Sequence, residues 1–226
     1  MSRNNAGLSA DRIINEALRI IDGQGLRRLT MRRLGDALQV EAMAVYHHFP
    51  LGKEALFDAI ADHVTDVARP DGDAPRPLPG DDPDDGADDP EGADPAADDR
   101  PWDERLRDWA HAYRTRLLRH SGALPLLINR RPDTEAALRA RDLQYGAFAE
   151  AGLTGAAVPR AAAALDSYVT GAVVHQVRAE GLPSPAPAAV DGRFPHLAAH
   201  AGAAPDHDRD FREGLDALLA ALVRAA

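Results

Sequence analysis

Histidines and carboxylates are the residues of this chain that could support metal binding or acid–base catalysis. The sequence contains nine histidines, and His196 and His200 stand four residues apart, which would place both on one face of a helix. Their segment is rich in alanine and proline and supplies no third fixed ligand, so we expect no metal site there. Cysteine is absent, and no nucleophile-elbow, Walker or dinucleotide-binding glycine motif occurs. The sequence therefore predicts neither an enzyme nor a bound cofactor.

Arginines near the N-terminus could instead neutralise the phosphates of a nucleic acid. The formal net charge is −10, but residues 70–99 hold twelve acidic residues against Arg76 alone. Residues 1–53, by contrast, hold eight basic and five acidic residues. Because charge acts locally, this modestly basic segment remains a candidate for DNA binding in an acidic chain.

The elements that must position these arginines are predicted to be helices. Hydrophobic residues make up 45% of the chain and aromatic residues only 5%, and alanine is abundant, which favours packed helices over sheets. Ser9 is a good N-cap, and apolar residues recur at helical spacing from there until Gly23. Further helices are predicted from Thr30 to about Gln39, from Glu41 to Phe49, and over 53–68.

A change of composition separates these helices from the rest of the chain. Residues 69–101 are mainly Pro, Gly, Asp and Ala with almost nothing to bury, so we expect an acidic disordered loop. Apolar residues return at helical spacing after Pro101, and helices are predicted over 102–120, 124–128, 133–151, 159–180 and 208–226. The Pro- and Ala-rich stretch 181–207 is expected to interrupt them.

The span from Thr30 to Phe49 has the pattern of a helix-turn-helix, with two short helices joined by a tight turn. In that motif the second helix enters the DNA major groove. The residues that would face DNA are Ala42, Met43, Ala44, Tyr46 and His47, and those that could contact flanking phosphates are Arg28, Arg32, Arg33 and Lys53. Two short amphipathic helices also occur in all-α proteins that bind no DNA, so the pattern alone leaves both interpretations open.

Residues 29–60, LTMRRLGDALQVEAMAVYHHFPLGKEALFDAI, resemble the N-terminal domain of the tetracycline-repressor (TetR) family of transcription regulators. Residues 102–132, 168–176 and 194–219 are similar to the tetracycline-repressor type of C-terminal domain. The resemblance implies an all-α homodimer. Its parts would be a three-helix helix-turn-helix domain (1–52), a connecting helix (53–68), the acidic loop (69–101) and a ligand-binding and dimerisation domain (102–226).

The resemblance also implies roles for individual residues of the helix-turn-helix. Arg32 matches an arginine that reads a guanine, Tyr46 and Lys53 match phosphate-binding positions, and Thr30 matches the cap of the supporting helix. Two departures from the family pattern stand out. The usual turn glycine is replaced by Gln39, which must either adopt a left-handed backbone at a cost of about 1 kcal/mol or change the turn. The loop before Lys53 is one residue longer than usual.

The predicted recognition helix is only weakly polar. Ala42 and Ala44 can make only apolar contacts, and we expect these to be with thymine methyl groups. We therefore expect sequence selectivity to depend on Arg32, Met43, His47 and DNA shape.

The resemblance places a small-molecule effector in the C-terminal helices. In the tetracycline repressor a histidine and a glutamate help to hold the drug and its magnesium, and the matching positions here are Leu127 and His175, so we do not expect a magnesium–tetracycline ligand. The positions predicted to line a largely apolar cavity are Trp109, Tyr113, Leu127, Arg131, Leu143 and His175. An Ala- and Leu-rich bundle could use the same residues simply as core.

The helices at 159–180 and 208–226 carry small and aliphatic stripes that could close the monomer core or form a four-helix bundle across a two-fold axis. The resemblance favours the dimer, and hence an inverted-repeat operator on double-stranded DNA. Without an apolar run of 18 residues or a signal-type N-terminus, we expect a soluble cytoplasmic protein that has no membrane contact. The predicted function is a repressor released by a small molecule; the alternative is a helical small-molecule-binding protein whose DNA binding is vestigial.

Overall fold

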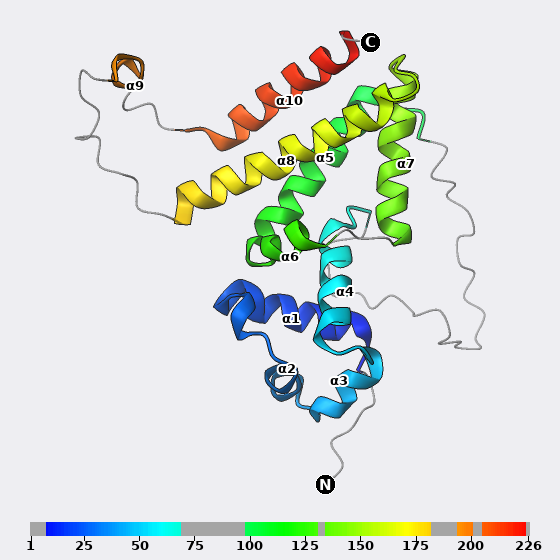
Figure 1. Cartoon of the computed structure of the whole chain (residues 1–226), viewed down its shortest axis with the longest axis vertical. Helices are drawn as coiled ribbons and strands as arrows, with labels where there is room; N and C mark the ends of the chain where they lie inside the picture. Colours follow the sequence, from blue (N-terminus) through cyan, green and yellow to red (C-terminus); the bar gives the residue numbers. More distant parts are fainter. Residues whose placement is uncertain (1–7, 69–97, 131–133, 182–193, 201–204, 225–226) are drawn as a thin grey trace.

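The computed structural model describes residues 8–68, 98–130, 134–181, 194–200 and 205–224, and over these ranges the chain forms helices and no strands (Figure 1). This confirms the predicted all-α class. Most of the predicted acidic loop, and Arg131 of the predicted cavity, lie outside the described residues.

The N-terminal helices bury the faces that their sequence periodicity predicts. They are α1 (Ala10–Gln24), the short 3-10 helix η1 (Leu26–Arg28), α2 (Met31–Leu38) and α3 (Ala42–His48). Every residue on the expected stripe of α1 is buried: Ile13, Ile14, Ala17, Leu18, Ile20 and Ile21. Both predicted caps form, since the side-chain oxygens of Ser9 and Thr30 accept hydrogen bonds from the backbone N–H groups of Arg12 and Arg33, each at 3.2 Å.

The fourth helix, α4 (Lys53–Thr65), runs from the N-terminal helices towards the C-terminal ones (Figure 1). It ends three residues earlier than the predicted limit at residue 68. The Thr65 hydroxyl donates to the carbonyl oxygens of Ala61 and Asp62, and the Asp66 side chain accepts from the Ala68 N–H. Such local side-chain bonds compete with the next helical turn, which accounts for the early end.

The C-terminal part packs α5 (Trp102–Arg119) against α8 (Ala157–Gly181), with α7 (Glu135–Glu150) and α10 (His207–Arg224) on either side (Figure 1). Short segments complete it: η3 (Ser121–Ala123), α6 (Leu124–Asn129) and α9 (Pro195–Ala199). The helix α9 lies within 181–207, the Pro- and Ala-rich stretch that is predicted to interrupt the longer helices. Its five residues are too few to show an amphipathic period.

The helices α8 and α10 approach each other closely at Gly214. A Cβ atom at this position would lie 2.3 Å from the Tyr168 hydroxyl oxygen. That hydroxyl donates a 2.7 Å hydrogen bond to the Phe211 carbonyl oxygen, and the Tyr168 and Phe211 rings stack with centroids 5.4 Å apart. Glycine is therefore required at residue 214 for this contact.

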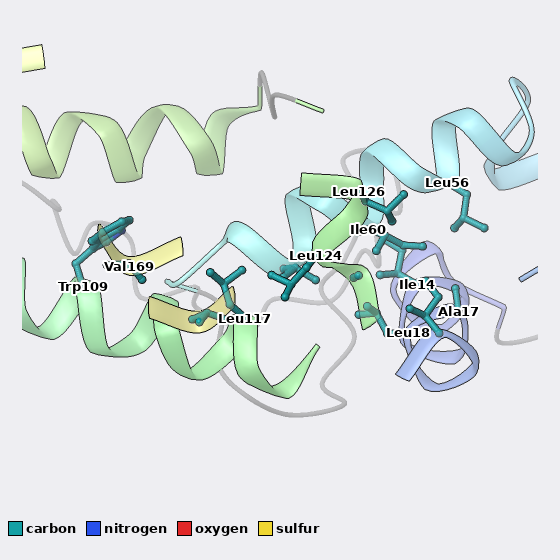
Figure 2. Close-up of a cluster of buried hydrophobic side chains, with 14 of the residues drawn as sticks. Ile14, Ala17, Leu18, Leu56, Ile60, Trp109, Leu117, Leu124, Leu126 and Val169 are labelled. Atoms are coloured by element: carbon teal, nitrogen blue, oxygen red, sulfur yellow. The ribbon is translucent and has the colours of Figure 1, made fainter. Parts of the chain in front are cut away.

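One hydrophobic core connects the two halves of the molecule. Figure 2 shows side chains of α1 and α4 meeting those of α6, and α5 continuing the contact towards α8. The labelled members are Ile14, Ala17, Leu18, Leu56, Ile60, Leu124, Leu126, Leu117, Trp109 and Val169, all of them buried. The helix-turn-helix is thus packed against the C-terminal helices rather than tethered to them.

Another close contact between the halves is at Gly122 of η3. A Cβ atom there would lie 2.9 Å from the Ile21 carbonyl oxygen near the end of α1. Beside it, His120 Nδ1 and Asp22 Oδ2 are 2.8 Å apart. The absence of a side chain at residue 122 lets these two backbones meet.

We predict that Gly122→Ala lowers the free energy of unfolding by about 1–3 kcal/mol, because the added methyl group meets a rigid backbone carbonyl. Gly146→Ala is the matched control. No atom lies within 4 Å of a Cβ at this helical position in α7, so the substitution should stabilise the chain by about 0.5–1 kcal/mol. Urea denaturation followed by circular dichroism measures both; a Gly122→Ala variant as stable as the unmodified chain would contradict the close contact.

Candidate DNA interface and effector cavity

The exposed side of α3 carries most of the residues predicted to face DNA. Met43 is 64% exposed and Tyr46 is 39% exposed, although both are large hydrophobic residues. His47 is exposed beside them and Ala42 is half-buried. Exposed large apolar side chains on a short helix are typical of a binding surface.

Ala44 is the exception among the predicted contacts on α3, because its side chain is buried. It is 5% exposed and belongs to the core together with Val45 of α3 and Phe49, the residue that follows this helix. The backbone of α3 turns this methyl group inward, towards α2. Alanine fits a core and a DNA-binding surface equally well, so the residue type alone could not predict that Ala44 is buried.

The turn between α2 and α3 takes the left-handed geometry, one of the two alternatives that the sequence leaves open at Gln39. Gln39 adopts φ 60° and ψ 33°, the left-handed conformation, in place of the usual glycine. Gly35 of α2 is also important for the approach of the two helices. A Cβ atom at this position would lie 3.1 Å from the Val40 carbonyl oxygen and 3.2 Å from the Ala42 nitrogen. Gly35 therefore lets α3 cross close to α2, and the sequence analysis missed this role.

Arginines form a basic hollow next to this turn. A depression of about 330 Å³ is lined by Arg27, Arg28, Thr30, Arg32, Arg33 and Asp36. All four arginines are exposed, and none takes part in the ion pairs that join described residues. Their charges are therefore available for phosphate groups. Arg27 was not among the predicted contacts; its signal is its place in the Arg27–Arg28 pair of η1.

The start of α4 brings two predicted phosphate contacts near each other. Gly52, with φ 69°, precedes Lys53, and a Cβ at Gly52 would lie 3.2 Å from the Tyr46 ring. The Lys53 ammonium lies 5.0 Å from the centroid of the Phe57 ring. The longer loop thus still places Lys53 on the same side of the molecule as Tyr46.

The C-terminal helices enclose a cavity of about 580 Å³, a volume suited to a drug-sized molecule. Trp109 and Tyr113 of α5 form an aromatic wall with ring centroids 5.0 Å apart. The remaining walls come from α7, α8 and the end of α4, with Tyr145, Arg141, Gln144, Asp166 and Thr65 among the lining residues.

Only part of the predicted cavity lining is brought together. Trp109 and Tyr113 line the cavity, whereas Leu127 and Leu143 are half-buried residues packed against the core outside it. His175 is exposed and lines a different cavity of about 400 Å³ between α5, α8 and α10. That second cavity contains Arg114, whose guanidinium is 2.8 Å from Asp208 and 4.8 Å from the Phe211 ring centroid. A helical period predicts which face is buried but cannot separate core from cavity.

Buried polar groups give the first cavity its hydrogen-bonding character. Desolvation raises the pKa of Tyr113 to about 12, and the nearby Asp166 carboxylate adds to the shift. Desolvation also raises the pKa of Asp166, although the Gln144 amide opposes this by donating a 2.9 Å hydrogen bond to Oδ1. Tyr113 therefore remains a donor at neutral pH. The sequence analysis missed Gln144 and Asp166; a polar Gln144 four residues before buried Phe148, on one face of α7, was the available signal.

Arg130 joins the cavity to α4. It lines the cavity, and its guanidinium pairs with Glu54 and Asp58 on successive turns of α4. One turn further on, the Thr134 hydroxyl donates to the Asp62 carboxylate. Desolvation lowers the pKa of Arg130, but the bonds to Glu54 and Asp58 outweigh this and raise it. Local sequence patterns could not predict the role of Arg130, because its partners are more than 70 residues away.

Neither a metal centre nor a membrane span is found in the part of the chain that the structure describes. No group of three or more metal-ligating side chains comes together there. None of the described helices is both long enough and apolar enough to cross a bilayer.

Two family models match this chain. Residues 13–60 match "Bacterial regulatory proteins, tetR family", and residues 94–225 match "Tetracyclin repressor-like, C-terminal domain". The tetracycline repressor protein class D of Escherichia coli is 27% identical over 217 residues, which cover 95% of this chain and 88% of that protein.

Two further relatives extend the comparison. An HTH-type transcriptional regulator of Saccharopolyspora erythraea is 28% identical over 172 residues, which cover 76% of this chain but only 62% of that longer protein. The crystal structure of Streptomyces coelicolor ActR in complex with (S)-DNPA is 26% identical, has a TM-score of 0.67, and covers 98% of this chain and 100% of that one.

We predict that Gln39→Gly stabilises the chain by about 0.5–1 kcal/mol, because glycine adopts the left-handed conformation without a Cβ clash. Gln39→Ala is the control, since alanine removes the amide but keeps the Cβ atom, and it should bring no gain. Thermal unfolding at fixed pH compares the two variants. Equal stability of the Gly and Ala variants would show that the turn stores no strain.

Proposed function

Because the chain belongs to the TetR family of DNA-binding transcriptional regulators, we propose that it is a homodimeric repressor of an inverted-repeat operator. A small molecule in the 580 Å³ cavity would release it from DNA. Members of this family are transcription regulators rather than enzymes, which agrees with the lack of catalytic motifs in the sequence.

The observation that carries this proposal is the pairing of an exposed recognition surface with a cavity at the other end of α4. Met43, Tyr46 and His47 lie exposed on α3, with the basic hollow beside them. Direct reading of bases needs exposed side chains at the start of the second helix, and phosphate contacts supply the remaining affinity. Arg32 is the residue we assign to guanine, because a bidentate arginine is the commonest specific contact.

An organic effector fits the cavity better than a magnesium–tetracycline complex. Its walls combine aromatic rings with a few polar groups, and no metal-ligating cluster forms among the described residues. The related ActR binds (S)-DNPA in its crystal structure, which supports a ligand for this chain as well. Binding would favour the dimer conformation that fits DNA poorly, by no more than the difference in affinity for the two conformations.

The proposed dimer uses faces that the monomer leaves partly open. On α10, Phe211, Leu215 and Leu219 are buried, whereas Leu218 and Leu222 on the adjacent stripe are only half-buried. A two-fold pairing of α8 and α10 would cover these leucines and hold two helix-turn-helix units one DNA turn or a multiple of it apart. In this arrangement residues 1–52 bind DNA, and residues 53–68 connect them to the rest of the chain. Residues 102–226, which follow the acidic loop 69–101, bind the ligand and form the dimer.

We predict that the purified chain enriches an inverted repeat from a random DNA pool at near-physiological salt. Arg32→Ala should bind the selected duplex at least about tenfold more weakly, since a bidentate contact is worth about 1–3 kcal/mol. Arg139→Ala, on α7, is the matched control and should bind as the unmodified chain does. If a folded dimer enriches no sequence, the alternative applies: a small-molecule-binding protein whose DNA binding is vestigial.

A separate prediction concerns the dimer. Leu222→Glu should yield monomers in sedimentation velocity, because a charge would be buried at the proposed interface. Leu138→Glu, at a position on α7 that is 51% exposed, should remain dimeric. A dimeric Leu222→Glu variant would place the interface elsewhere.

A further inference from the structure

The Arg130 side chain faces two sets of partners at once. On one side its guanidinium pairs with the carboxylates of Glu54 and Asp58, and Nη1 donates to the Glu54 carbonyl oxygen at 3.3 Å. Its planar group also lies 5.3 Å from the centroid of the Phe57 ring on α4. On the other side Arg130 lines the cavity of α5, α7 and α8. Arg130 is therefore both the partner of the two α4 carboxylates and one of the cations of the cavity lining.

The charges that line the cavity favour an acid. Arg130 and Arg141 contribute two cations, whereas Asp166 is the one carboxylate among the described lining residues. Desolvation raises the pKa of Asp166, although the hydrogen bond from the Gln144 amide and the charge of Arg141 oppose this shift. The rings of Trp109, Tyr113 and Tyr145 supply flat apolar surface. A planar aromatic molecule that bears an acidic group matches this lining.

We propose that the effector is an aromatic acid and that its acidic group takes Arg130 away from Glu54 and Asp58. The guanidinium can form strong paired hydrogen bonds with one carboxylate-like group at a time on each edge, so the ligand and α4 compete for it. This inference rests on the proposed function, to which it adds the class of ligand and the residue that senses it.

Loss of the Arg130 contacts would act directly on the DNA-binding end of α4. Glu54 is the second residue of α4 and follows Lys53, the predicted phosphate contact. Asp58 lies one turn further along the same face, and Phe57, which Arg130 covers, also lies under the Lys53 ammonium. Freeing this face loosens the attachment of α4 where it meets the helix-turn-helix.

The test uses 2-naphthoate and its neutral, nearly isosteric amide, 2-naphthamide, with binding measured by isothermal titration calorimetry in the absence of DNA. The unmodified chain should bind the acid about tenfold more tightly than the amide, as expected for one charge-assisted hydrogen-bond pair. Arg130→Met should abolish the preference, and Arg139→Met, a matched loss of an arginine outside this cavity, should keep it. Equal binding of acid and amide, or no binding of either, would overturn the proposal.

A second variant separates loss of a contact from loss of the fold. Glu54→Gln combined with Asp58→Asn removes the competing carboxylates, so it should bind the acid more tightly than the unmodified chain does. Misfolding cannot produce a gain in affinity, and unchanged or weaker binding would contradict the competition.

A separate measurement of release from DNA distinguishes failure of this inference from failure of the proposed function. On the duplex selected from the random pool, 2-naphthoate should release the unmodified chain, and release should fail with Arg130→Met. A chain that selects no DNA would refute the proposed function, while the calorimetric preference would still decide the class of ligand.

Discussion

The apolar contact between the helix-turn-helix and the C-terminal helices is the interaction on which the rest of this structure depends. Leu56 and Ile60 of α4 are fully buried between α1 and α6, and Gly122 brings η3 onto the end of α1. Close-packed interiors do not deform continuously; they change by moving between discrete packings. The orientation of the DNA-binding end is therefore set by how α4 packs, and not by a flexible link.

Polar contacts are placed so as to bias that packing without being its main source of stability. Glu54, Asp58 and Asp62 recur on one face of α4 and meet Arg130 and Thr134 from the segment after α6. Further along, the Arg116 guanidinium donates to the His63 carbonyl oxygen at 2.9 Å. Half-exposed ion pairs contribute little to folding stability, but their rearrangement is cheap. Such ion pairs can rearrange when the protein changes conformation, whereas the buried leucines keep the helices packed together.

The sequence predicted the parts of the fold that depend on local pattern. The buried stripe of α1 and the Thr30 cap follow from helical period and residue type, and both are present, while the left-handed Gln39 is one of the two turn geometries that the sequence leaves open. The side chains of Ala44, Leu127 and Leu143 lie in or against the core, because a small or aliphatic residue at helical spacing suits core and site alike, and His175 lines the second cavity rather than the first. The role of Arg130 could not be predicted from the sequence, because the Glu54 and Asp58 carboxylates come near it only in the folded chain.

The contact at Gly214 has a consequence for how the two subunits of such a dimer would be related. With Tyr168 seated over residue 214 and bonded to the Phe211 carbonyl oxygen, α10 has a single register against α8. A slide by one helical turn would place a side chain where the phenol lies. This contact therefore determines which faces of α8 and α10 meet each other. Substitutions on the outer faces of α8 and α10 would then leave the contact between Tyr168 and Gly214 unchanged.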